Sequence, residues 1–369
     1  MIDLAAEYQL YQPVLQEKII QVLAKGNYIN GDEVALFEQN LAHYLDVKHV
    51  ISCGNGTDAL QIALMALDIG NGDEVIIPAF TYIAAIEVVC LLGATPVLVD
   101  VDPVYFQMDP KALESAISKK TKAIIPVHLF GQCANLAEIL QLAKQYQIPI
   151  IEDNAQALGS KYGIQEEPKF LGTFGEIGCT SFFPTKNLAC FGDGGALFTN
   201  DDALAEKIRM IANHGQKEKY QHEMVGVNSR LDTLQAAILN FKLNHLAQQL
   251  STKKQLANQY LKELSGLKGL ILPQAFKESL HTWHQFTIQV AAKDRDPLKS
   301  FLSLKGIESM IYYPKAVDQQ KAYQQYHQQL PIAKKLSSTV LSLPIHALML
   351  PEEISYVCNQ LKYFFNAQN

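Results

Sequence analysis

Between residues 49 and 200 the chain alternates short apolar runs with amphipathic helical patterns, and this alternation constrains its fold more than any other feature. We interpret seven apolar runs as strands, at residues 49–53, 75–77, 96–101, 122–127, 148–151, 179–183 and 196–199. Helical patterns, such as the one at residues 136–146, lie between several of them. The alternation predicts an α/β fold with a mainly parallel, twisted sheet covered by helices on both faces. Ligands of such sheets bind at the carboxyl ends of the strands.

The domain organisation follows from a change of pattern after residue 231. A long helical pattern runs from Leu231 through Leu250 to Leu264, and the remainder of the chain contains fewer glycines. We expect this helix to join a large domain, residues 1–240, to a smaller C-terminal α+β domain, residues 241–369. The length of 369 residues suits such a pair of domains.

Composition excludes several classes of partner. The formal net charge is −6, from 31 Lys and Arg against 37 Asp and Glu, whereas a protein that binds nucleic acid is usually basic. The six cysteines show neither CxxC pairs nor zinc-ligand spacing, which is typical of a reducing, cytoplasmic compartment and predicts no metal site. The apolar stretch at residues 75–99 is interrupted by Pro78, Gly93 and Pro96, so we expect a buried core and no membrane span.

The first candidate motif is Cys53-Gly-Asn-Gly-Thr-Asp58, which follows a predicted strand and opens a helix. Glycines allow a ligand to approach the backbone, and the free amides of Thr57 and Asp58 at the helix start would bind an anion such as phosphate. The alternative is an ordinary strand-to-helix turn in which Thr57 or Asp58 is the N-cap.

The second candidate motif is the apolar strand at residues 148–151, which leads into Glu152 and Asp153. A carboxylate at a buried strand end is costly unless a cation meets it, and a protonated pyridine nitrogen is such a cation. The alternative, which the residues favour equally, is that Asp153 caps the following segment.

The third candidate motif places Lys186 between two apolar strands, in the segment Thr180 to Asn187 that precedes the glycine-rich residues 192–195. A loop lysine is ordinarily solvated. Here the surrounding Ser, Pro and Gly residues indicate a fixed backbone, and a sequestered lysine can lose its proton and form a Schiff base.

These three segments, in this order and at this separation, resemble the DegT/DnrJ/EryC1/StrS family of pyridoxal-phosphate-dependent sugar aminotransferases. The resemblance covers nearly the whole chain and continues through residues 212–215 and 225–232, then more weakly through 341–346. It implies the fold type I, or aspartate aminotransferase-like, architecture. It also implies a homodimer whose active sites lie between the subunits.

The resemblance assigns a role to each motif residue. Lys186 would hold pyridoxal 5′-phosphate as a Schiff base and carry protons during the reaction, and Asp153 would partner the pyridine nitrogen. Gln156 would lie beside the 3-oxygen of the ring, and Tyr82 would stack on the ring. The residues implied as phosphate ligands are Thr57, Asp58, Ser181 and, from the opposite subunit, Asn228.

The substrates implied are L-glutamate and a nucleotide-linked keto sugar. The motifs look most like those of relatives that aminate C3 of UDP-2-acetamido-3-oxo-glucuronate for O-antigen sugars. Arg230 of the neighbouring subunit would then meet the uronate carboxylate, although a structural ion pair with an aspartate is an equal alternative. Near the substrate the family usually has His-Tyr-Pro, whereas this chain has Tyr312, Tyr313 and Pro314.

Two other functions compete with this one. The first keeps the cofactor and transfers the amine to C4 of a dTDP- or UDP-4-keto-6-deoxy sugar. The second is a non-catalytic regulatory or ligand-sensing protein, for which the complete set of Lys186, Asp153 and Ser181 would be superfluous.

Overall fold

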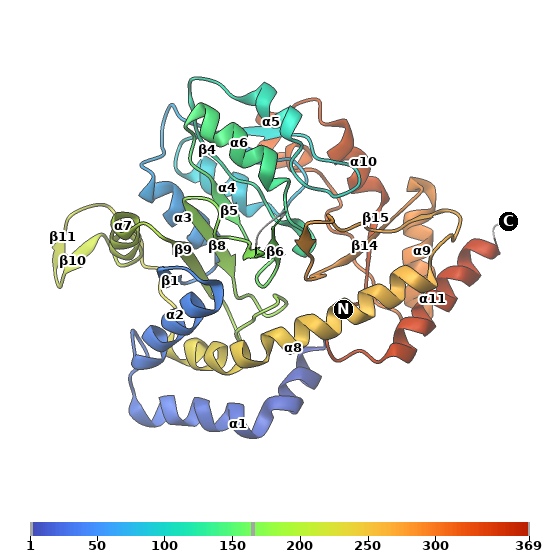
Figure 1. The fold of residues 1–369 in the computed structure, drawn as a ribbon, viewed down its shortest axis with the longest axis horizontal. Coiled ribbons are helices and arrows are strands. Elements are labelled where there is room, and N and C mark those ends of the chain that lie inside the picture. Colours follow the sequence, from blue (N-terminus) through green and yellow to red (C-terminus); the bar gives the residue numbers. More distant parts are fainter. Residues whose placement is uncertain (1–2, 164–166, 368–369) are drawn as a thin grey trace.

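The structure is a computed structural model and describes residues 3–163 and 167–367. The large α/β domain is built around a central sheet that helices cover. The long helix α8 (Thr233–Glu263) leads from this domain toward a smaller C-terminal domain (Figure 1). The single long helix expected after residue 231 is therefore present. The predicted domain boundary after residue 240 falls inside α8 and stays a prediction.

The central sheet is built from the strands that the alternation predicts. They are β1 (His49–Cys53), β2 (Glu74–Pro78), β3 (Thr95–Val99), β4 (Thr121–Ile124), β5 (Ile151–Asp153), β8 (Ile177–Ser181) and β9 (Gly195–Thr199). Their order is β3-β2-β4 and β5-β8-β9-β1, and the parallel bridges Ile124–Ile150 and Val127–Asp153 join the two groups. Strand β9 is antiparallel to β8 and β1, whereas β2 is parallel to β3 and β4, and β5 is parallel to β8. The expectation of a mainly parallel sheet is confirmed.

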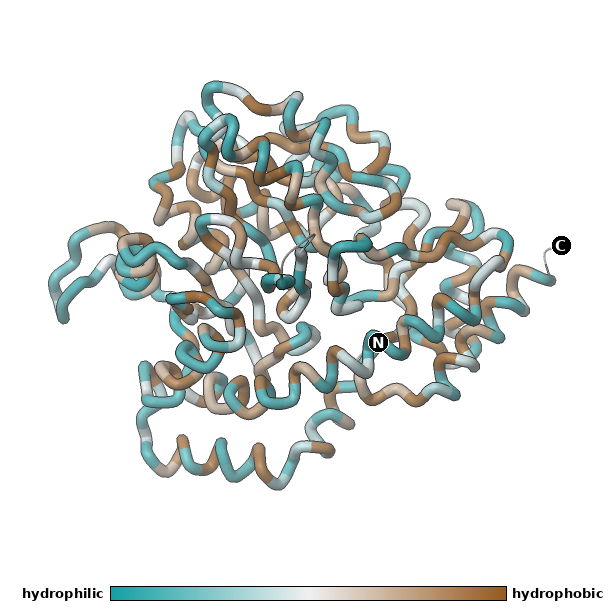
Figure 2. Tube along the Cα trace, viewed as in Figure 1, coloured by the Kyte–Doolittle hydropathy of each residue, from teal (hydrophilic) through white to brown (hydrophobic). Residues whose placement is uncertain are grey.

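Helices cover the sheet and bury its apolar residues. Those that precede α8 are α1 (Leu4–Lys25), α2 (Asp32–Leu45), α3 (Gly56–Ala66), α4 (Ala84–Leu91), α5 (Pro110–Ala116), α6 (Leu136–Tyr146) and α7 (Asp202–Ala212). Hydrophobic residues concentrate along the inner strands and on the inward faces of these helices (Figure 2). Ile76, Ile77 and Ala63 are fully buried, as expected for strands and a helix inside a layered domain.

The C-terminal domain has its own sheet and core. Strand β14 (Phe286–Val290) pairs with β12 (Leu270–Ile271) and β15 (Val340–Leu343). Helices α9 (Ala292–Leu304) and α11 (Pro351–Asn366) contribute to the core of this domain, whereas Ala333 and Leu336 of α10 (Pro331–Thr339) pack into the core of the large domain. The core includes Tyr260 from the second half of α8, packed against Phe286.

Several very short strands were not expected from the sequence. Strand β6 (Lys161–Tyr162) pairs with β7 (Lys169–Phe170) and β13 (Ser279–Leu280), and β10 (Gln216–Glu218) with β11 (Gln221–His222). The β10–β11 hairpin projects from the body beside α7 (Figure 1). Strands of two or three residues carry no readable alternation, which explains their absence from the prediction. Among the described helices, none is both long enough and apolar enough to cross a bilayer.

Candidate active site

One cavity, of about 820 Å³, opens at the carboxyl ends of β1, β2, β5 and β8. This position agrees with the general rule for ligand sites in α/β sheets. The predicted site residues that line it are Thr57, Asp58, Tyr82, Asp153, Gln156, Ser181, Lys186, Tyr312 and Tyr313. Asn228 and Arg230 do not line this cavity.

Asp153 ends β5 with its carboxylate buried at the cavity wall, where the side chain is 8% exposed. The Ala155 amide donates a hydrogen bond of 3.0 Å to Asp153 Oδ1, so the capping contact considered from the sequence is present as well. Burial raises the pKa of Asp153, and the Ala155 amide and the Lys186 charge offset only part of that rise. A cationic group of a ligand would therefore stabilise the ionised carboxylate.

A buried pair behind Asp153 was not recognised in the sequence. The side chains of His128 and Glu152 are fully buried, with 2.8 Å between His128 Nε2 and Glu152 Oε2. His128 Nδ1 accepts a hydrogen bond from the Ala134 amide, so the ring proton is on Nε2. The Nε2–H group donates a hydrogen bond to the Glu152 carboxylate. The His128 main-chain amide donates to the Asp153 carbonyl oxygen at 3.0 Å. The pair thus fixes the strand end from which Asp153 projects.

Lys186 lies in the loop after β8, and its main-chain amide donates to the Phe183 carbonyl at 2.8 Å. Burial lowers the pKa of the Lys186 ammonium group, and the opposing charge of Asp153 offsets part of that decrease. A lysine with a lowered pKa supplies more neutral amine, the form that attacks carbonyl carbons and accepts protons.

The start of α3 presents main-chain amides to the cavity, and its cap differs from the one considered in the sequence. Asn55, and neither Thr57 nor Asp58, is the N-cap, and its side chain accepts from the Asp58 amide at 2.8 Å. The Asp58 amide is therefore not free, because the Asn55 side chain reaches it first. The amides of Gly56 and Thr57 precede the intrahelical ladder and can face an anion. A side chain at Gly56 would place its Cβ 2.7 Å from Ser181 Cβ, so the glycine allows the helix start to approach Ser181.

An aromatic and amide wall encloses another side of the cavity. Gln156 Oε1 accepts from the Phe130 amide at 2.8 Å, and Gln156 Nε2 donates to the Tyr313 hydroxyl at 2.9 Å. Burial raises the pKa of Tyr313, so its phenol is protonated at neutral pH. Tyr82 is 58% exposed, and its ring centroid lies 6.2 Å from that of Tyr313. Gln156 therefore couples the large domain to the segment that carries Tyr312 and Tyr313.

Arg230 lies in a separate groove of about 280 Å³, which Arg209 and Ser229 also line. Arg209 forms an ion pair with Glu38, with 2.8 Å between Arg209 Nη2 and Glu38 Oε2. Within residues 3–163 and 167–367, no carboxylate lies within ion-pair distance of Arg230, so the structural ion pair considered from the sequence is absent there. Ser229 Oγ donates to Asp58 Oδ2 at 2.6 Å, which attaches this groove to the cavity wall.

His284 and Thr81 also line the cavity and were not singled out in the sequence. His284 Nδ1 and Thr81 Oγ1 are buried and have no hydrogen-bond partner among the described residues. Burial, and then the nearby Lys186 charge, keep the pKa of His284 well below the ordinary histidine value, so the imidazole is neutral. His284 enters from the C-terminal domain, about a hundred positions after Lys186 along the chain, and no local pattern identifies it. In the described part of the chain no cluster of three or more metal-ligating acidic, His or Cys side chains occurs.

Comparison with known proteins gives consistent matches. The model of the DegT/DnrJ/EryC1/StrS aminotransferase family matches residues 12–362. The chain is 43% identical over 360 residues to the UDP-2-acetamido-2-deoxy-3-oxo-D-glucuronate aminotransferase of Pseudomonas aeruginosa, with 98% of both chains covered. The crystal structure of S. venezuelae DesV in complex with a ketimine intermediate matches with a TM-score of 0.95 and 39% identity, covering 98% of this chain and 97% of that one. Bacillus subtilis NtdA with bound cofactor PMP matches with a TM-score of 0.88 and 32% identity, covering 95% and 81% of the two chains. The fold expected from the resemblance is confirmed.

Proposed function

The chain belongs to the DegT/DnrJ/EryC1/StrS aminotransferase family, and on that premise we propose that it transfers an amino group from L-glutamate to C3 of UDP-2-acetamido-2-deoxy-3-oxo-D-glucuronate. The proposed cofactor is pyridoxal 5′-phosphate. The observation that carries the proposal is the meeting of Lys186, Asp153 and the anion-binding start of α3 in one cavity.

The residues of the cavity fit this cofactor chemically. The Gly56 and Thr57 amides and the Ser181 hydroxyl suit a phosphate, and the buried Asp153 carboxylate suits a protonated pyridine nitrogen. Lys186 supplies an amine for the aldehyde. The unpartnered atoms Thr81 Oγ1 and His284 Nδ1 leave hydrogen-bonding capacity in the wall for a polar ligand.

Pyridoxal phosphate, when bound, supplies an electron sink and carries the amino group between the two substrates. Asp153 would hold the proton on the pyridine nitrogen. Lys186, with its lowered pKa, takes and returns the proton at the reacting substrate carbon. Gln156 orients the Tyr313 hydroxyl at the cavity wall, and the exposed Tyr82 ring offers a flat apolar face to the pyridine.

The proposed substrate is that of the Pseudomonas aeruginosa relative, and two features of this chain support it. Arg230 has no carboxylate partner among the described residues, which suits it to bind the carboxylate of a uronate bidentately. The cavity of about 820 Å³ is wide enough for a cofactor and part of a sugar nucleotide. Tyr312 and Tyr313 would contact the sugar from the cavity wall.

The proposed assembly is a homodimer with shared active sites. The support is that Asn228 and Arg230 do not line the cavity of their own chain, although the family resemblance gives both a role there. We further propose that the enzyme works in the cytoplasm, where its free cysteines stay reduced, and supplies amino sugars for surface polysaccharide.

The decisive experiment is to measure amino transfer and cofactor attachment together. Protein loaded with pyridoxal phosphate should change its visible absorbance on addition of L-glutamate and then aminate the UDP-3-keto uronate. Borohydride reduction followed by peptide mass spectrometry should find the cofactor on Lys186. The variant Lys186→Ala should show neither result, whereas Lys169→Ala, which changes an exposed lysine, should behave like the wild type.

Two results would overturn this proposal. Turnover of dTDP- or UDP-4-keto-6-deoxy sugars in preference to the 3-keto uronate would favour 4-amination. Binding of ligand without any amino transfer would favour a regulatory protein.

A further inference from the structure

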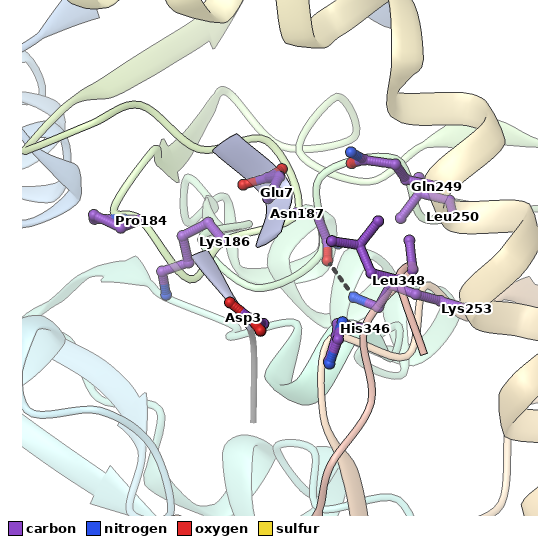
Figure 3. Close-up of a pocket in the computed structure, with 11 residues that line it drawn as sticks. Asp3, Glu7, Pro184, Lys186, Asn187, Gln249, Leu250, Lys253, His346 and Leu348 are labelled. Carbon is purple, nitrogen blue, oxygen red and sulfur yellow. Dashed lines mark hydrogen bonds between the residues drawn. The ribbon is translucent and has the colours of Figure 1, made fainter. Parts of the chain in front are cut away.

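Lys253 is a buried cation close to the active site but outside the mechanism described so far. It lies on α8, is 6% exposed, and donates a hydrogen bond of 2.9 Å to Asn187 Oδ1. Figure 3 shows this bond, with the Lys186 side chain directed away from it. Burial of an ammonium group is costly unless its hydrogen bonds are satisfied, so the bond to Asn187 is an important contact for Lys253.

Among the residues that the structure describes, Lys253 has no carboxylate partner. A cavity of about 50 Å³, which has room for about one or two water molecules, lies between α1, α8 and the loop that carries Lys186. Both acidic residues that line it have other partners, because Asp3 caps α1 and Glu7 pairs with Lys242 at 2.9 Å. His346 lines the same cavity, and its pKa is lowered by burial. Burial likewise lowers the pKa of Lys253 to about 7.

The Asn187 side chain connects Lys253 to the wall of the active-site cavity. Asn187 follows Lys186 directly, and its Nδ2 donates to the Leu158 carbonyl oxygen at 3.1 Å. Leu158 lies two residues after Gln156 and five after Asp153. A relay of two hydrogen bonds, Lys253 to Asn187 to Leu158, therefore joins α8, the lysine loop and the segment that follows β5.

We propose that Lys253 is a positioning residue, which acts through Asn187 to hold Lys186 in register with Asp153 and Gln156. The role in catalysis rests on the proposed function. Proton transfer requires the donor and acceptor to be placed closely, so a small displacement of Lys186 lowers the rate more than it weakens substrate binding.

The test compares variants that keep or remove the relay. Lys253→Met removes the donor and keeps the length of the side chain, Lys253→Arg keeps a cationic donor, and Lys254→Met alters the exposed neighbour on the same helix. In protein free of cofactor, Lys253→Met should accelerate hydrogen exchange in residues 185–188. It should also raise the pH at which Lys186 becomes half-labelled by an amine reagent, because a looser loop hydrates the ammonium. Lys253→Arg should restore much of both values, and Lys254→Met should change neither.

In protein loaded with pyridoxal phosphate, Lys253→Met should lower kcat about tenfold with KM for both substrates within about twofold. Asn187→Ala provides a second route, and combining it with Lys253→Met should add little if both act through one relay. Loss of stability with unchanged exchange and labelling at Lys186 would overturn the proposal. Because these two measurements need no cofactor, they test the relay even if the wild type binds no pyridoxal phosphate, a result that would overturn the proposed function alone.

Discussion

The cavity that contains Lys186 and the groove that contains Arg230 are joined by the hydrogen bond from Ser229 to Asp58. The two regions differ in the partners of their polar side chains. In the cavity, Asp153 and Gln156 are held by main-chain amides from their own chain. In the groove, Arg230 has no carboxylate partner within the described ranges. One chain therefore holds the polar side chains of the cavity in place, whereas the Arg230 charge in the groove meets no carboxylate among the described residues. The predictions below test this difference.

The largest expected effect is in the cavity, from Asp153→Asn. The amide keeps the shape and a hydrogen bond but removes the charge that holds the pyridine proton, so kcat should fall by about 10²-fold or more. Cofactor content, measured by absorbance, should be largely retained. Near-normal turnover would mean that the cavity is not organised around Asp153.

The second prediction asks whether the groove serves the opposite cavity. Lys186→Ala and Asn228→Ala, each nearly inactive alone, are mixed under conditions that let dimers exchange. Random reassortment makes half of the dimers mixed, and one of their two sites carries neither change, so about a quarter of all sites should recover activity. Activity no higher than the average of the two mutants would show that Asn228 acts in its own chain.

The third prediction concerns the charge in the groove. Arg230→Lys keeps the charge but loses the bidentate geometry, so kcat/KM for the 3-keto uronate should fall roughly tenfold further than for an analogue without the carboxylate. The matched control is Arg209→Lys, because Arg209 lines the same groove but is bound to Glu38. Equal losses with both substrates at Arg230 would assign it a structural role.

The smallest expected effect is on the pH dependence of stability, and it arises from the burial of Lys253 beside the active-site cavity. Lys253 has a pKa of about 7 in the folded state, below that of an unfolded lysine, so the unfolded chain binds more protons between about pH 7 and 10. Its burial cost is fully present below pH 7 and decreases as the pH rises. From pH 7 to 8, the free energy of unfolding of the wild type should rise by about 1 kcal/mol relative to Lys253→Met. Denaturant titrations of both proteins measure this difference, and a constant difference would contradict the lowered pKa.

Local patterns were sufficient to predict much of the fold, and three residues that they singled out, Lys186, Asp153 and Ser181, line the cavity. Strand β1 and helix α6 have the predicted bounds, Asp153 and Ser181 end β5 and β8, and Lys186 follows β8. The apolar runs that form these strands are legible in the sequence. The alternative that Thr57 or Asp58 caps α3 is wrong, since Asn55 is the N-cap. All three are good capping residues, and only the backbone geometry decides among them.

Other features depend on contacts between distant parts of the chain. His284 reaches the cavity from the C-terminal domain, and Lys253 has the sequence context of a solvated lysine on an amphipathic helix. Its burial arises from packing near α1 and the lysine loop, which no window of sequence reveals. That Arg230 has no ion pair within residues 3–163 and 167–367 likewise depends on the tertiary structure.

The unbroken course of α8 limits how this chain can change in evolution. Asp232 occupies the N-cap position of the helix, two positions after Arg230, and Lys253 lies about six turns further along. Each residue inserted into a helix turns everything beyond it by about 100° and advances it by about 1.5 Å. A single insertion between Thr233 and Lys253 would therefore turn the Lys253 side chain away from Asn187, even where the inserted residue touches only solvent. Length variation in this stretch should therefore be selected against.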